Sequence, residues 1–306
     1  MSLPFLVWLF LSIIWGSTWL FIKLGLEHLP PFTFSGLRFL LAAIPLMAVL
    51  LLRRQRLPAA GSDWKLISIT GVLTFTLNYG LIFWGENYIS SGLTAILFTT
   101  LPLFGLVIAH FHLPSEPITL RKVFGVLLGI LGVATIFSNQ LHVDTANAVW
   151  GCLAVVSAAS LGAYAGVLIK AHGKHLDPFT LTTGQMLVGF GPLLVIGYLL
   201  EGNPSAHSWT GEAWLALFYL AFVGSSLTFV LLYWLIKRID ITKTQLIPLA
   251  STLVAVLLGR VVLNEELDWR TGLGGAGILA GLVMSTWKER SGQSAAQLPT
   301  SGTDAE

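Results

Sequence analysis

The chain carries one sequence pattern twice. Residues 22–45 and 169–192 lie 147 positions apart and share Lys23 with Lys170, His28 with His175, Pro31 with Pro178, Phe32 with Phe179, Thr33 with Thr180, and Pro45 with Pro192. A second set lies at offsets near 150 and pairs Ile89 with Ile239, Ala109 with Gly259, Arg121 with Arg270, Gly125 with Gly274, and Gly132 with Gly281. Such self-similarity predicts a duplicated unit of about 140 residues, with one copy in 1–140 and the other in 141–290.

The composition places both copies in a lipid bilayer. Hydrophobic residues make up 55% of the chain and charged residues 10%, whereas a soluble domain carries about 25% charged residues. A spanning helix needs roughly 20 mostly apolar residues. The chain offers ten such stretches, near 4–24, 33–52, 66–85, 91–111, 121–138, 148–169, 179–200, 213–235, 244–262 and 271–287. We therefore predict an all-α integral membrane protein with ten transmembrane helices.

An odd number of spans in each copy makes the second copy inverted relative to the first. The loop charges test this independently, because basic residues collect on the cytoplasmic side. With a cytoplasmic N-terminus, thirteen of the 17 Lys and Arg residues fall on that side, and Lys23, Arg260 and Arg270 on the other. Both termini are thus predicted to be cytoplasmic, with a disordered tail over 291–306. The net charge of +2 reflects this topology and does not indicate a nucleic-acid partner.

Two inverted copies of a helical bundle give a pathway whose ends are built from equivalent parts. Such a molecule opens to either side when its halves exchange conformations, with the ligand near the bilayer midplane. Polar and aromatic residues inside the helices are poorly explained by packing against lipid. The pattern therefore favours a transporter over a duplicated scaffold without a pathway.

Several motifs give the chain a family resemblance. The run Trp15-Gly16-Ser17-Thr18, Lys23, the loop Leu29-Pro30-Pro31 and the segment 37–42 resemble the first half of an EamA-type member of the drug/metabolite transporter superfamily. Pro102 with the following Glu116, and the segment 259–265, resemble the same family, so the likeness covers residues 4–288.

The resemblance implies an inverted-repeat carrier in a bacterial inner membrane. Its central cavity would lie between helices one to four and six to nine, with helices five and ten at the periphery. One departure is that Thr252 stands where the family usually has a proline in helix nine, and Pro248 lies one turn earlier. The bend and its gating role would then be displaced.

Helical spacing collects candidate cavity residues on single helix faces. Residues three or four apart share a face of an α-helix, and aromatic rings with hydroxyl and amide groups suit a ligand that is partly flat and partly polar. The candidates are Trp15, Trp19, Asn78, Tyr79, Phe83, Tyr164, Ser226 and Tyr233. Interhelical hydrogen bonding and core packing stay open as the alternative for each.

A second group combines polar residues and helix bends. Arg38 is a charge well inside a span, where it should face protein or water, and it could either extend to the outer surface or have a partner such as Glu86. Its counterpart in the second copy is the neutral Gln185, and Pro102 and Pro248 are gating candidates. No Asp or Glu lies in the middle of a predicted span, which favours facilitated diffusion over proton coupling.

Two other patterns have simpler explanations than a ligand site. Gly272, Gly274 and Gly277 match a dinucleotide fingerprint, but they begin an apolar span without a preceding strand, so close helix contact is favoured. His110 and His112 lack other evident metal ligands nearby. We therefore expect no cofactor, no metal site and no catalytic residues.

The sequence thus predicts a transporter that exports small amphipathic metabolites by alternating access through a central cavity. Aromatic helix faces, and the frequency of amino-acid exporters in the family it resembles, favour amino acids, with aromatic or apolar ones preferred. Two alternatives stay open: a proton-coupled exporter of drugs, nucleosides or other metabolites, and an integral-membrane enzyme. The expected partners are a small-molecule substrate and membrane lipid, and a monomer is the working expectation.

Overall fold

The structure is a bundle of membrane-length helices. The computed structural model describes residues 2–55, 58–138, 146–263 and 269–286, and no β-strand occurs within these ranges. Its α-helices are α1 (Leu3–Leu26), α2 (Pro31–Leu52), α3 (Gly61–Gly71), α4 (Tyr79–Glu86), α5 (Ser91–Phe98), α6 (Leu101–His112), α7 (Leu120–Ile136), α8 (Ala146–His172), α9 (Pro178–Glu201), α10 (Gly211–Phe218), α11 (Thr228–Ile236), α12 (Ile241–Gln245), α13 (Ile247–Leu263) and α14 (Trp269–Thr286). Two π-helical segments, η1 (Val72–Asn78) and η4 (Tyr219–Leu227), and a short 3₁₀ turn, η3 (Pro204–Ala206), complete the description.

The length and hydropathy of these elements make the chain a multi-pass membrane protein. Seven helices or continuous helical runs among the described residues can each cross a bilayer: Leu3–Leu26, Pro31–Leu52, Gly61–Glu86, Leu93–His112, Ala146–His172, Pro178–Glu201 and Gly211–Ile236. The shorter or less apolar α7, α13 and α14 cover the remaining predicted spans.

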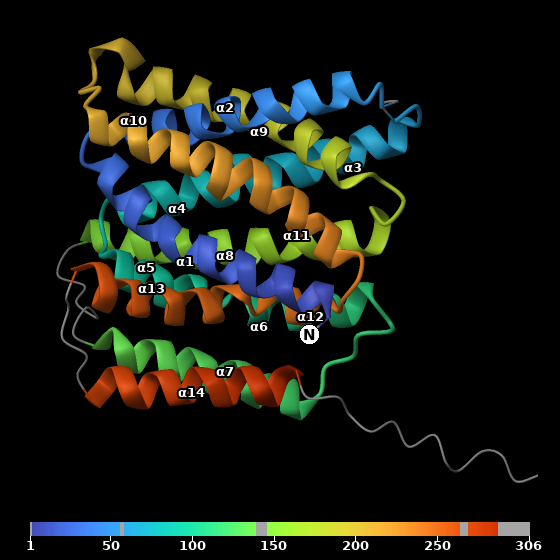
Figure 1. Cartoon of the computed structure of the whole chain (residues 1–306), viewed down its shortest axis with the longest axis vertical. Helices are drawn as coiled ribbons and strands as arrows, with labels where there is room; N and C mark the ends of the chain where they lie inside the picture. Colours follow the sequence, from blue (N-terminus) through green and yellow to red (C-terminus); the bar gives the residue numbers. More distant parts are fainter. Residues whose placement is uncertain (1, 56–57, 139–145, 264–268, 287–306) are drawn as a thin grey trace, which may run out of the picture.

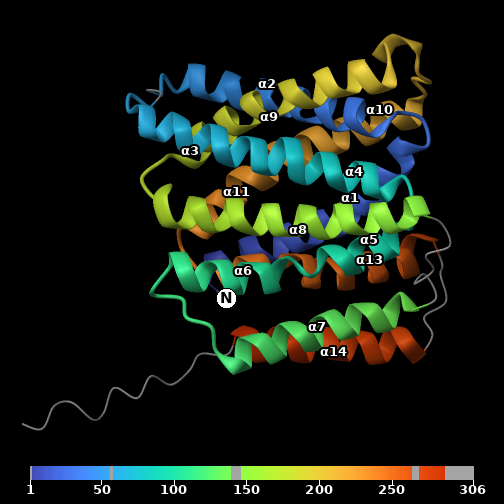
Figure 2. The same cartoon turned by 180° about the vertical axis from the view of Figure 1, so that it is seen from behind.

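The main helix pairs join the first half of the chain to the second. α2 lies along α9 at one edge of the bundle, and α7 lies along α14 at the opposite edge (Figures 1 and 2). Between these edges, α1 packs along α13, and α8 packs against α4 and α6. We name the two ends of the bundle after equivalent lysines. The Lys23 end holds the turns 27–30 and 87–90, and the Lys170 end holds 113–119, 173–177 and 237–240.

Glycines set the close approach of α7 and α14. A Cβ on Gly132 would lie only 2.5 Å from the carbonyl oxygen of Gly274, and one on Gly281 would meet the carbonyl oxygen of Gly125. Small residues let helix backbones touch in this way inside a membrane. The prediction of close helix contact is therefore confirmed for Gly274 and Gly277, which both face Gly132, but it is wrong for Gly272, which has nothing within 4 Å.

Carboxylates satisfy backbone donors at two helix starts. The Glu201 carboxylate accepts hydrogen bonds from the backbone N–H groups of Phe32 and Thr33, both at 2.8 Å. The Glu116 carboxylate accepts from the N–H groups of Ile241 at 3.0 Å and Thr242 at 3.4 Å. The first N–H groups of a helix have no partner within the helix, so these distant acidic residues fix how α2 and α12 begin.

Two predicted spans are broken where prolines occur. The predicted span 91–111 is divided at Thr99 and Thr100 into α5 and α6, and Pro102 lies in the first turn of α6. Likewise α12 ends at Gln245, and Pro248 lies at the start of α13. Proline lacks the N–H group that a continuous helix requires, and it is tolerated in a first turn.

Some sequence expectations concern residues outside the described ranges. They are the disordered tail over 291–306, most of the segment that links the two copies, and Glu265 in the motif that resembles the transporter family.

Candidate functional site

A central cavity of about 130 Å³ lies between α1, the η1–α4 run, α8, α11 and the α12–α13 run. Its lining combines aromatic rings, aliphatic side chains and neutral polar groups. The lining residues are Trp15, Thr18, Trp19, Ile22, Thr74, Asn78, Tyr79, Ile82, Phe98, Leu101, Gly162, Gly166, Ile169, Phe229, Leu232, Tyr233, Ile236, Ile241, Thr244, Gln245, Pro248 and Ser251. No Asp, Glu, Lys or Arg belongs to this described lining.

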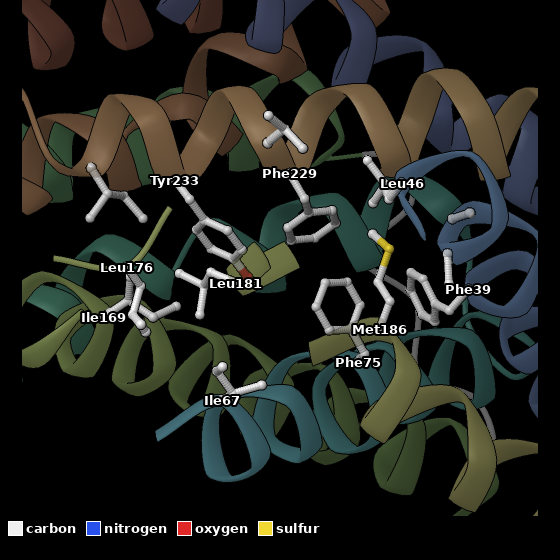
Figure 3. Close-up of a cluster of buried hydrophobic side chains, with 14 of the residues drawn as sticks. Phe39, Leu46, Ile67, Phe75, Ile169, Leu176, Leu181, Met186, Phe229 and Tyr233 are labelled. Carbon is white, nitrogen blue, oxygen red and sulfur yellow. The ribbon is translucent and has the colours of Figure 1, made fainter. Parts of the chain in front are cut away.

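Aromatic side chains from both halves of the chain meet beside this cavity. The ring centroid of Phe229 lies 5.8 Å from Trp15, 6.0 Å from Tyr79 and 5.9 Å from Tyr233. Figure 3 shows Phe75 and Phe229 pointing toward each other from opposite helices, with Tyr233 beside them. Tilted and edge-to-face rings at such separations attract one another, which makes this wall of the cavity rigid.

Polar groups of the lining are held by backbone carbonyls of α8. Asn78 Nδ2 donates to the carbonyl oxygen of Ala158 at 2.5 Å, and Gln245 Nε2 donates to that of Ala163 at 3.1 Å. Three buried atoms of the lining make no hydrogen bond within the described part of the chain: Trp15 Nε1, Tyr233 Oη and Gln245 Oε1. A buried polar group without a partner costs free energy. Gln245 Oε1 faces the backbone of Gly105 in α6, where an added Cβ would collide with it, whereas Trp15 and Tyr233 carry their unpartnered atoms on the aromatic wall of the cavity.

Six of the predicted site residues lie around the cavity: Trp15, Trp19, Asn78, Tyr79, Tyr233 and Pro248. Phe83 is instead fully buried behind the lining, with its ring centroid 5.4 Å from Phe34. Pro102 is buried directly after the lining residue Leu101.

Tyr164 and Ser226 do not line the central cavity. α8 presents Gly162, Gly166 and Ile169 to it, so Tyr164, two residues beyond Gly162, points away and packs beside His112. Ser226 lies in η4, where the π-helical turn shifts the register of the α-helical face on which it was placed. Its hydroxyl donates to the carbonyl oxygen of Ala42 at 2.8 Å and borders a separate groove of about 590 Å³ between α2, α9 and the η4–α11 run.

Arg38 does not extend to the outer surface; it has buried partners, but they lie in η4 and Glu86 is not among them. The Arg38 side chain is 1% exposed. Nε donates to Ser225 Oγ at 2.8 Å, and Nη2 donates to the carbonyl oxygen of Gly224 at 3.1 Å. The guanidinium carbon also lies 4.8 Å from the ring centroid of Tyr79. A charge inside a membrane faces protein groups that can receive its hydrogen bonds, and the irregular turn of η4 supplies them here.

The other predicted polar residues are fully buried. Gln185 Nε2 donates to Thr70 Oγ1 at 2.5 Å, which joins α9 to α3. Glu86 is 0% exposed, and neither of its carboxylate oxygens has a hydrogen-bond partner among the described residues. Glu86 lies one turn beyond Ile82 of the lining, toward the Lys23 end.

Sequence reasoning missed several lining residues. Gly162 and Gly166 stand four residues apart, which is the spacing of small residues on one helix face. A Cβ on Gly162 would lie 2.7 Å from Asn78 Nδ2, so this glycine lets Asn78 approach α8. Gln245 was also missed, although it is a polar residue three positions before Pro248 in a predicted span.

Both halves of the chain match one family of membrane transporters. Residues 3–138 and residues 149–287 match the EamA-like transporter family. The chain is 30% identical over 276 residues to the uncharacterized transporter YoaV of Bacillus subtilis. The aligned region covers 90% of this chain and 94% of YoaV. This chain is also 29% identical over 273 residues to the uncharacterized inner membrane transporter YedA of Escherichia coli K12, with 87% and 81% of the two chains covered.

The fold has a counterpart among known structures. A chain from a crystal structure matches this one with a TM-score of 0.77, over 92% of this chain and 96% of the other. The sequence identity of 18% limits that likeness to the fold.

Proposed function

Because this chain belongs to the EamA-like transporter family, we propose that it is a carrier that exports neutral amino acids, aromatic or apolar ones preferred, by facilitated alternating access. The observation that carries the proposal is the lining of the central cavity. It combines aromatic rings with neutral polar groups and contains no charged side chain among the described residues. Membership in a transporter family favours transport over chemical turnover, and hence a carrier over a membrane enzyme.

The size and chemistry of the cavity support this substrate class. A cavity of about 150 Å³ lined by apolar side chains can hold a benzene ring, and the central cavity is of similar size at about 130 Å³. A neutral amino acid is a zwitterion without net charge, so it needs hydrogen-bond partners more than a counter-ion. The unpartnered Trp15 Nε1 offers a donor, and the unpartnered Tyr233 hydroxyl can donate or accept.

Pairs of equivalent contacts support ten spans arranged as two inverted repeats. Thr76 Oγ1 donates to the carbonyl oxygen of Gly189 at 2.8 Å, and Ser226 Oγ donates to that of Ala42 at 2.8 Å. Adding 150 to Thr76 gives Ser226, and adding 147 to Ala42 gives Gly189, so exchanging the two halves turns one bond into the other.

The histidines at the two ends follow the same rule. His28 Nε2 lies 3.2 Å from Glu212 Oε2, and the equivalent His175 Nε2 lies 2.8 Å from Asp63 Oδ1. Contacts that repeat under exchange of the halves are what a carrier needs if its two ends are to open in turn.

We also propose that the protein lies in the inner membrane with both termini cytoplasmic. The asymmetry of loop Lys and Arg residues supports this orientation, and YedA is named an inner membrane transporter. In this orientation the Lys170 end faces the cytoplasm.

Exchange across proteoliposomes tests the proposed substrate. Vesicles holding the purified protein would be loaded with one unlabelled compound, and entry of its labelled form would be followed with and without a pH gradient. We expect phenylalanine and leucine to exchange without a gradient, and nucleosides and cationic dyes to exchange poorly. Exchange of a nucleoside or dye that requires a pH gradient, with none for amino acids, would overturn the proposal in favour of proton-coupled export.

A further inference from the structure

The two equivalent lysines, Lys23 and Lys170, have different surroundings in this structure. The half-buried Lys170 Nζ donates to the carbonyl oxygens of Ile236 and Ile239, both at 2.6 Å. These two bonds connect the last turn of α8 to the end of α11 and the turn that follows it. They lie directly beside the cavity, because Ile169 and Ile236 belong to its lining.

Further contacts hold the same end together. Lys237 donates to the carbonyl oxygen of Leu176, and burial lowers the pKa of the Lys237 ammonium while the nearby Asp177 carboxylate opposes this shift. The Glu116 carboxylate holds the start of α12, as described above, and is 5% exposed. The Lys170 end of the cavity is therefore fastened by charged side chains bonded to backbone groups.

Lys23 lacks the bonds that Lys170 makes. Lys23 is exposed, and its ammonium makes no hydrogen bond among the described residues. Under the sequence repeat, the two bonding partners of Lys170 have counterparts in the first half of the chain. Ile239 corresponds to Ile89, and Ile236 corresponds to Glu86. Glu86 itself is fully buried near this end, and its two carboxyl oxygens have no hydrogen-bond partner among the described residues.

We propose that Lys23 and Lys170 are alternating latches of the transport cycle. Lys170 closes its end of the cavity in the state seen here. In the opposite state, Lys23 bonds to the backbone carbonyls of Glu86 and Ile89 and pairs with the Glu86 carboxylate. The inference rests on the proposed alternating access, but it does not depend on which substrate is carried.

The buried Glu86 explains why such a latch would switch. A buried carboxyl group whose oxygens have no hydrogen-bond partner costs free energy, and an ammonium that reached it would supply hydrogen bonds and would stabilise its ionised form. In the present state Lys170 has hydrogen-bond partners and the Glu86 side chain has none among the described residues. In the opposite state Glu86 would gain Lys23 as a partner, and Lys170 would lose its own partners. Two states that each satisfy one lysine can lie close in free energy, as alternating access requires.

Distances between spin labels at the two ends test the proposal without any substrate. In the full chain with Cys152→Ala, one sample would carry Glu27→Cys with Tyr88→Cys, and a second would carry Lys174→Cys with Arg238→Cys. All four positions are exposed, and the first pair corresponds to the second under the repeat. Double electron–electron resonance would then measure each distance in Lys170→Met, in Lys23→Met and in the double variant.

We expect Lys170→Met to lengthen the 174–238 distance and to shorten the 27–88 distance. The population ratio of the two states should change roughly tenfold, because a change of that size corresponds to the net free energy of about one hydrogen bond to a charged group. Adding Lys23→Met should remove the short 27–88 distance. Lys122→Met is the matched control, since Lys122, in the first turn of α7, donates to the Pro117 carbonyl oxygen at 2.9 Å and neither residue lines the cavity.

The proposal is overturned if Lys170→Met leaves both distances unchanged, or if the 27–88 distance shortens equally with and without Lys23. If Lys170→Met fails to fold, Lys170→Gln keeps a neutral amide N–H₂ donor group and should shift the distances in the same direction by less. The labels report conformation alone. A negative result here with normal phenylalanine exchange would therefore reject the latches and leave the proposed function intact.

Discussion

Arg38 Nε donates a 2.8 Å hydrogen bond to Ser225 Oγ, which joins the buried charge of α2 to the π-turn of η4. The carbon of the same guanidinium lies 4.8 Å from the ring centroid of Tyr79, and Tyr79 lines the central cavity. Residues of the second half of the chain thus hold the Arg38 guanidinium in place beside Tyr79, which belongs to the aromatic wall of the site.

Removing this guanidinium should destabilise the protein. Arg38→Met leaves Ser225 Oγ and the Gly224 carbonyl without their donor, and we expect a loss of about 1–3 kcal/mol. Arg38→Lys should restore only part of it, because an ammonium lacks the planar donor fork. Thermal unfolding in detergent measures both. Arg53→Met is the control, since Arg53 also covers an aromatic ring, that of Phe179, but is exposed. Equal losses at the two positions would contradict the role given to Arg38.

The contact between α7 and α14 gives a second prediction. Gly132→Ala should lower the unfolding temperature, because the added Cβ would lie 2.5 Å from the Gly274 carbonyl oxygen. Gly272→Ala, which has open space around it, should instead be neutral or stabilising by roughly 0.5–1 kcal/mol. Unfolding curves of the two variants should therefore move in opposite directions, and a shared direction would refute this packing.

The cap that Glu116 provides to α12 should be sensitive to substitution. Glu116→Ala leaves the buried N–H groups of Ile241 and Thr242 without an acceptor, and we expect a loss of about 1–3 kcal/mol. Glu27→Ala removes an exposed carboxylate at the other end of the bundle and serves as the control. Thermal unfolding should separate the two variants, and an unchanged midpoint for Glu116→Ala would show that the cap is dispensable.

Narrowing the cavity should change substrate preference. A Cβ on Gly166 would lie 3.4 Å from Gln245 Nε2, so Gly166→Ala adds volume with little displacement. We expect exchange of phenylalanine to fall several-fold while exchange of alanine changes little, because lost space penalises the larger side chain first. Gly191→Ala, with nothing within 4 Å, is the control. Equal reduction for both amino acids would argue against Gly166 as a determinant of size.

Helix positions were predictable because membrane spans are long apolar runs, and a run of that length has few alternatives. The resemblance to the transporter family is likewise confirmed. The site was harder to predict, because periodicity assumes a regular α-helix. The π-turn of η4 breaks that assumption at Ser226, and the partners of Arg38 lie 186 and 187 residues away in sequence.

Tyr164 illustrates a second limit. Tyr164 was a candidate for the cavity face of its helix, yet the two glycines at 162 and 166 mark the face of α8 that meets the cavity. A helix between protein and lipid can carry aromatic residues on either side, so an aromatic residue alone does not identify the inner face. In this helix, small residues were the better signal.

Counterflow of phenylalanine tests the central claim most directly. Proteoliposomes loaded with unlabelled phenylalanine would be followed for uptake of the labelled compound, with wild type, Trp19→Ala and Trp214→Ala compared. Trp19 lines the cavity, whereas Trp214 is 41% exposed and lies outside the lining. We predict accumulation without a pH gradient in wild type and Trp214→Ala, and a strong reduction in Trp19→Ala. Absence of accumulation from folded wild-type protein, or equal accumulation in all three, would contradict an amino-acid carrier that works through this cavity.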